Sequence, residues 1–159
     1  MSSEDDRETR SQLQVLATFV RAELAAAGLP VTPEDHPPGT AGAVVGIDPT
    51  ELDGVEVGWR THAILLDAAQ DAWADDPLAE GAEYAAFSRQ GTAIAEAMKD
   101  ALRRILTAAG FAVADSGNDY APHGLLVTGR PEVSPWEARR SAALHRRQEK
   151  MIAVWNNRG

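Results

Sequence analysis

The sequence predicts an α+β protein in which helices pack on an antiparallel or mixed sheet of about five strands, in the order α-β-β-β-α-α-β-β-α. Two observations predict this class. Long segments repeat apolar residues every three or four positions, and shorter segments between them alternate apolar and polar residues. With 159 residues, 44% of them hydrophobic, the chain is long enough for one domain, 1–159, with a substantial core.

Two long helices are expected first, because each has an apolar face and a glycine after its last turn. In the first helix, expected over 5–27, the apolar face is formed by Leu13, Leu16, Val20 and Leu24. Gly28 follows it directly, and Gly110 follows a second helix expected over 81–109. A glycine just past the last periodic residue is typical of a helix that ends in left-handed backbone geometry.

The remaining elements follow from short-range patterns. Strands are expected at 29–33, 42–48, 54–61, 111–115 and 124–130, and helices at 62–75 and 135–156. In the third strand, Val55, Val57 and Trp59 alternate with more polar residues, so one face of that strand is predicted to be apolar.

Two similar segments lie at an offset of 82 residues: "RAELAAAGLPV" at 21–31 and "RRILTAAGFAV" at 103–113. Over 21–49, nine of 29 positions are identical to their counterparts without a gap. Two interpretations stay open: an internal duplication with half-repeats 1–77 and 78–159, or a shared helix, glycine and strand pattern. Both predict that each half folds as a helix, a hairpin and a following helix.

This order of elements resembles that of the small chaperones of type III secretion and their relatives, α-β-β-β-α-β-β-α proteins that commonly work as dimers. The resemblance concerns topology alone and assigns no role to any residue. It implies a homodimer that binds other proteins.

Charge is uneven along the chain. The formal net charge is -9, yet residues 134–159 contain six bases and two acids and so carry +4, which leaves -13 for the rest. A body this acidic repels nucleic acid and anionic membranes. The acidic amino terminus and the absence of a long apolar run predict a cytoplasmic protein without a membrane segment. Thirteen arginines against two lysines are typical of a bacterial genome rich in G and C.

Motifs for catalysis or cofactor binding are absent from the sequence, and no cofactor is expected. There is no cysteine, no phosphate-binding loop, no HExxH and no G-x-S-x-G. His36 and His123 lie in expected loops beside acidic residues, and they are the best candidates for a metal site or for acid–base chemistry. Turn geometry explains the composition of these loops equally well. A small metal- or ligand-dependent enzyme is therefore an alternative function.

The last expected helix is the main functional candidate, because it combines aromatic, apolar and basic residues. Its candidate partner-binding residues are Trp136, Arg140, Arg147, Met151 and Trp155. They predict a non-enzymatic protein-interaction module with a chaperone-like, adaptor or regulatory role, which binds another protein or a second copy of itself. Two alternatives remain: ordinary packing of this helix on its own sheet, and a nucleic-acid-associated regulator that uses the basic helix.

Overall fold

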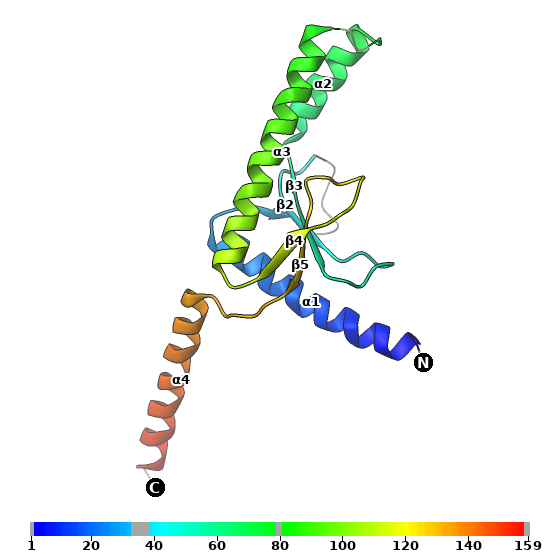
Figure 1. The fold of residues 1–159 in the computed structure, drawn as a ribbon. Coiled ribbons are helices and arrows are strands. Elements are labelled where there is room, and N and C mark those ends of the chain that lie inside the picture. The colour runs from blue at the N-terminus through cyan, green and yellow to red at the C-terminus, as the bar shows by residue number, and fades with distance from the viewer. Residues whose placement is uncertain (1, 33–38, 79–80, 158–159) are drawn as a thin grey trace.

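A computed structural model describes residues 2–32, 39–78 and 81–157 and confirms the α+β class (Figure 1). The helices are Ser2–Ala26 (α1), Ala63–Asp75 (α2), Ala82–Ala108 (α3) and Pro135–Asn156 (α4). The strands are Val31–Thr32 (β1), Gly42–Gly46 (β2), Val55–Arg60 (β3), Ala112–Asp115 (β4) and Leu125–Gly129 (β5). The order of elements is the predicted one. Among the described residues, no helix is both long and apolar enough to cross a membrane.

The glycines after α1 and α3 adopt the predicted left-handed backbone, with φ values of 84° at Gly28 and 93° at Gly110. The two helix ends also share their hydrogen bonds. In each, the residue after the glycine donates its N–H to the carbonyl five positions earlier: Leu29 to Leu24 and Phe111 to Leu106. This is the Schellman arrangement, in which the residue after the glycine often makes an apolar contact with the helix. It explains why the similar segments 21–31 and 103–113 both have an apolar residue directly after the glycine.

The sheet is mixed, with the strand order β1-β2-β3-β5-β4. Its β2–β3, β3–β5 and β5–β4 pairs are antiparallel, whereas β1 runs parallel to β2 with Val31 opposite Ala43. The prediction of a hairpin in each half is therefore correct for β4 and β5 and wrong for β1 and β2.

The geometry at Gly42 accounts for the short parallel strand. Leu29 donates its N–H to the end of α1 and Pro30 has none, so pairing starts only at Val31. The chain then returns beside Pro30, whose carbonyl accepts the Ala43 N–H at 2.8 Å. Gly42 permits this approach, because its φ is 139° and an added Cβ would lie 2.6 Å from the Pro30 oxygen.

The core lies between one face of the sheet and the two helices that cover it, α1 and the carboxyl-terminal half of α3 (Figure 1). The helices and the segment after α3 contribute Leu13, Ala17, Val20, Leu24, Leu102, Leu106, Ala109 and Phe111. The strands contribute Ala43, Val45, Val55, Val57, Leu125 and Val127, with Trp59 partly buried beside them. This core is complete without α2 or α4.

Besides the amino-terminal half of α1, two structures project from this body, and these two point in opposite directions (Figure 1). One is the hairpin formed by α2 and the amino-terminal half of α3, and the other is α4. The hairpin begins at His62, whose Nδ1 accepts the Ile64 N–H at 3.1 Å and so caps α2. Its tip and the free end of α4 therefore lie far apart in one molecule.

Candidate interaction site on the last helix

The start of α4 is held against the body by the chain that leads into it. Glu132 donates its N–H to the Gly110 carbonyl at 3.2 Å, which places this segment on the end of α3. Ser134 is buried with extended backbone, and Pro135 takes the first helical position, where its missing N–H leaves no intrahelical bond unmade. The direction of α4 is set at this point.

Four side chains then fix the first turn of α4, and we call them the base cluster: Glu23, Arg130, Trp136 and Glu137. The indole N–H of Trp136 donates to both carboxylate oxygens of Glu23 on α1, at 2.9 and 3.0 Å. Arg130 pairs with Glu137, and its guanidinium carbon lies 4.3 Å from the centre of the Phe19 ring. These contacts join α4 to α1 and determine where α4 leaves the body.

Beyond its first turn, α4 is a single helix in solvent. No residue of α4 is buried. Met151 is 71% exposed and Trp155 is 81% exposed. Three more apolar side chains on α4 are also more than half exposed: Leu144, Ile152 and Val154. A soluble domain rarely leaves so many large apolar groups on one isolated helix without a partner surface.

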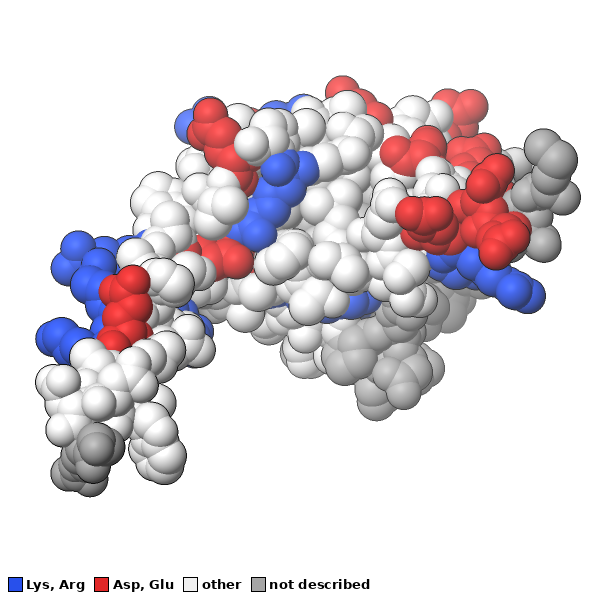
Figure 2. Space-filling model, turned by 90° about the horizontal axis from the view of Figure 1, so that it is seen from below, with Lys and Arg blue, Asp and Glu red and all other residues white. Residues whose placement is uncertain are grey.

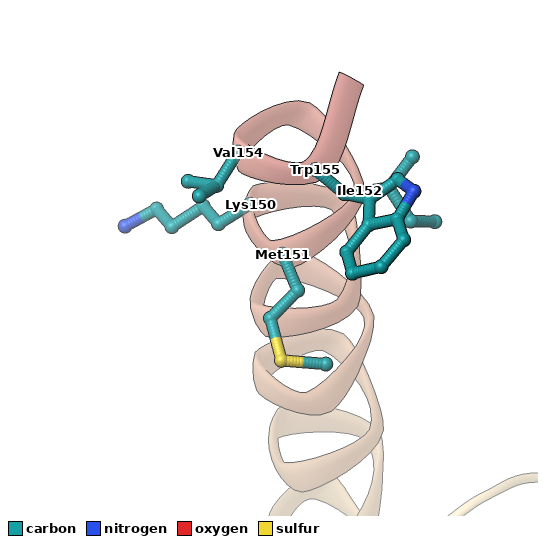
Figure 3. Close-up of a pocket in the computed structure, with 5 residues that line it drawn as sticks. All are labelled: Lys150, Met151, Ile152, Val154 and Trp155. Carbon is teal, nitrogen blue, oxygen red and sulfur yellow. The ribbon is translucent and has the colours of Figure 1, made fainter. Parts of the chain in front are cut away.

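Three of these apolar side chains share one side of α4, and the other two lie on either side of them. At 3.6 residues per turn, Leu144, Met151 and Trp155 lie within about 40° of one another around the helix axis. Figure 3 shows Trp155 and Ile152 on one side of Met151, with Val154 and Lys150 on the other. Together the five form the distal apolar face of α4: Leu144, Met151, Ile152, Val154 and Trp155.

An apolar hollow of about 550 Å³ lies on this face. Every described residue that lines it belongs to α4, from Lys150 to Trp155, so within the described part of the chain the hollow has a floor and no opposite wall (Figure 3). A small-molecule site would bury most of its ligand between several elements. A second protein surface would supply the missing wall.

Basic residues flank this face. Between Pro135 and Asn156, α4 has five bases, Arg139, Arg140, Arg146, Arg147 and Lys150, against the acids Glu137 and Glu149, for a net charge of +3. Figure 2 shows these blue side chains at one end of the molecule and a gathering of red ones at the other. Within the described residues, neither Arg140 nor Arg147 contacts a carboxylate.

The five predicted partner-binding residues thus separate into two groups. Arg140, Arg147, Met151 and Trp155 all lie on the exposed length of α4. Trp136 lies at its base, hydrogen-bonded to Glu23, so it positions the helix. Sequence patterns did not indicate Glu23 or Arg130, because their contacts with α4 depend on the tertiary fold.

The histidine loops give no comparable site. His36 lies outside the described residues, so its relation to His123 stays a prediction. His123 lines a hollow of about 270 Å³ with Trp59 and Tyr120, and no described carboxylate lines that hollow. Among the described residues, no three side chains of His, Cys, Asp or Glu are grouped so that they could hold a metal ion.

An acidic hollow of about 320 Å³ lies between the β2–β3 and β4–β5 loops. Five carboxylates line it: Asp48, Glu51, Asp53, Glu56 and Asp119. Partial burial raises the pKa of the Glu56 carboxyl above its usual range, and the negative charges of its acidic neighbours raise it further. The ionised form of Glu56 is therefore less favourable in the folded protein than in the unfolded chain.

Replacing Glu56 with glutamine is expected to stabilise the protein more at pH about 7 than at pH about 4. A carboxyl with a raised folded-state pKa binds its proton more readily in the folded chain. It therefore adds stability at low pH, which is lost as pH rises through the folded-state pKa. Thermal melts of both proteins across this range test the prediction, and a larger gain on the acidic side would contradict it.

Comparison of the chain with known protein families, with curated proteins and with solved structures finds no match. No relative therefore assigns a role to α4 or to the acidic hollow. The exposed face of α4 and its charge are the features on which a function can be argued.

Proposed function

We propose that this chain is a non-enzymatic protein-interaction module, with a chaperone-like, adaptor or regulatory role, and that α4 is its contact surface. One observation carries the proposal: a helix anchored firmly at its base exposes its distal apolar face to water although the core of the body is complete without it.

The energetics of an isolated helix support this role. Most helical stability in proteins comes from packing of an apolar face, and beyond its first turn α4 lacks such packing. Binding of α4 to another surface would bury Met151 and Trp155 and stabilise the helix at the same time. Aromatic and arginine side chains side by side are also the types most enriched at binding hot spots.

Charge indicates the kind of surface that α4 would bind. With +3 on α4 and a strongly acidic remainder of the chain, an acidic protein surface would be attracted to α4, whereas bare nucleic acid would also meet the repulsion of the body. The partner is therefore proposed to be a protein with acidic and apolar groups on one face.

The double variant Arg140→Glu/Arg147→Glu is expected to abolish association while leaving the melting temperature of the isolated protomer nearly unchanged. Both side chains are exposed and contact no described carboxylate, so the fold does not depend on them. Association is measured in two ways: self-association by sedimentation equilibrium, and binding to other proteins by capture from cells of the source organism. Wild-type association should also weaken as salt rises.

A matched control makes the same change of charge elsewhere. Arg7→Glu/Arg104→Glu alters two exposed arginines on α1 and α3 and should leave association intact. Equal loss in both double variants would mean that net charge matters and α4 does not. Retained association in the α4 variant, with a melting temperature lower by many degrees, would show that α4 belongs to the protomer's own fold.

A further inference from the structure

The α2–α3 hairpin buries few apolar side chains between its own two helices. Ala72 is the one residue of α2 that is buried. Leu66 and Trp73 lie seven positions apart and therefore on one side of α2, where they are 57% and 50% exposed. Two helices with so little buried between them would pack better with a third helix beside them.

The hairpin carries the charge opposite to that of α4. Its first helix contains Asp67, Asp71 and Asp75 and no lysine or arginine. No lysine or arginine occurs anywhere between Thr61 and Ser88 in the sequence. On α2 the aspartates begin at Asp67, about 100° around the helix from Leu66, and on α4 the arginines likewise lie to one side of the apolar residues.

The two surfaces also match in length. The distal apolar face of α4, from Leu144 to Trp155, spans about 17 Å at 1.5 Å per residue, and the 13 residues of α2 span about 20 Å. Within one molecule the two cannot meet, because the base cluster directs α4 away from the hairpin (Figure 1). The matching surface must therefore belong to another copy.

The opposite directions of the two projections permit a closed pair of molecules. A two-fold axis perpendicular to the long direction of the molecule in Figure 1 would place α4 of each copy beside the hairpin of the other. Both contacts would then be identical, and each projection would be covered once. Such a pair leaves neither α4 nor the hairpin of either copy free to bind a third copy.

Other surfaces of a second copy fit α4 less well. Pairing of α4 with α4 would bring two helices of +3 together. The acidic start of α1 has no large exposed apolar side chain before Val15 among the residues whose side chains are described. The acidic hollow is lined mainly by carboxylates and polar loop residues and has little apolar surface for Trp155.

We propose that α4 docks on the α2 side of the α2–α3 hairpin of a second copy, and that the reciprocal contact forms a closed homodimer. This proposal rests on the proposed function of α4 and names its partner surface. Trp155, Met151 and Leu144 pack against Leu66 and Trp73, while the arginines of α4 face Asp67 and are attracted by the negative charge of the other α2 aspartates.

A charge exchange tests the pairing directly in the full chain. Sedimentation equilibrium of the wild type should give twice 17.0 kDa. Asp67→Arg/Asp71→Arg should reduce the mass to 17.0 kDa, as should Arg140→Glu/Arg147→Glu. A chain with all four changes has the opposite pairs restored in both contacts and should dimerise again. That recovery also excludes misfolding as the reason for the two losses.

Disulfide trapping locates the contact, because the chain has no cysteine of its own. Trp73→Cys/Met151→Cys should form a covalent dimer on mild oxidation, whereas Ala114→Cys/Met151→Cys should not. Crosslinking of Met151→Cys alone would indicate that α4 pairs with α4, and it would overturn the proposal.

The results also separate this proposal from the more general one. If the α4 variant loses association and the α2 variant keeps it, α4 remains the contact surface and its docking on the hairpin is excluded. If the α4 variant keeps association as well, both proposals fail. A wild type that stays at 17.0 kDa at all workable concentrations overturns the homodimer.

Discussion

Replacing Arg130 with methionine is expected to lower the free energy of unfolding by about 3 kcal/mol. The Arg130 side chain is 11% exposed and that of its partner Glu137 is 25% exposed, so the change leaves a largely buried carboxylate without its cation. The estimate is the low end for removing one member of a buried ion pair, because Glu137 keeps some contact with water. Methionine retains apolar contact with the Phe19 and Phe111 rings.

The double variant Arg130→Met/Glu137→Met is the control. It removes both charges, so its stability should recover to within about 1 kcal/mol of wild type. Urea unfolding at a dilution where the chain is monomeric measures all three proteins without the stabilising effect of association. If the single and double variants lose the same stability, the ion pair does not hold the base of α4.

Gly110→Ala should cost about 3 kcal/mol, more than the loss of a left-handed glycine alone. A Cβ at this position would lie 2.5 Å from the Glu132 carbonyl oxygen and 2.8 Å from its carbon, in addition to the strain at φ 93°. Both neighbours are backbone atoms, which cannot rotate away as a side chain could. The segment that leads into α4 would have to shift.

Gly28→Ala is the matched control for this prediction. Gly28 ends α1 with nearly the same φ of 84°, but an added Cβ would meet nothing within 4 Å. It should therefore show the cost of the left-handed geometry alone, about 1 kcal/mol. Thermal melts should separate the two variants by several degrees at this chain length. Equal losses at the two glycines would refute the close approach of Glu132.

The helices were predictable because their signals are local. The final helix was expected over 135–156 and occupies Pro135–Asn156, since a proline begins it and its periodicity continues to its end. The ends of α1 and α3 at glycine could also be predicted from the sequence, because a Schellman arrangement involves only six consecutive residues. These features need no knowledge of the rest of the fold.

The direction of β1 and the contacts that anchor α4 could not be predicted from local sequence patterns. The parallel course of β1 depends on where the chain returns beside Pro30, and the composition of the loop does not reveal it. Trp136 bonds to Glu23 across 113 positions of sequence, a distance at which no local pattern gives a signal. The absence of lysine and arginine around α2 is evident in the sequence. That these acidic residues lie on a projecting hairpin is shown only by the fold.

The two edges of the sheet restrict how any partner can attach. Within the described residues, β1 is only two residues long, and β4 is four residues long with an irregularity between Ala112 and Val113. At the far end of β4, hydrogen bonds from Lys99 and Arg103 lower the pKa of Asp115 and keep a charge on that edge. Short, irregular and charged edges resist the addition of a foreign strand. The described edges of the sheet therefore resist edge-to-edge pairing, which agrees with the proposal that the protein binds through side chains of its helices.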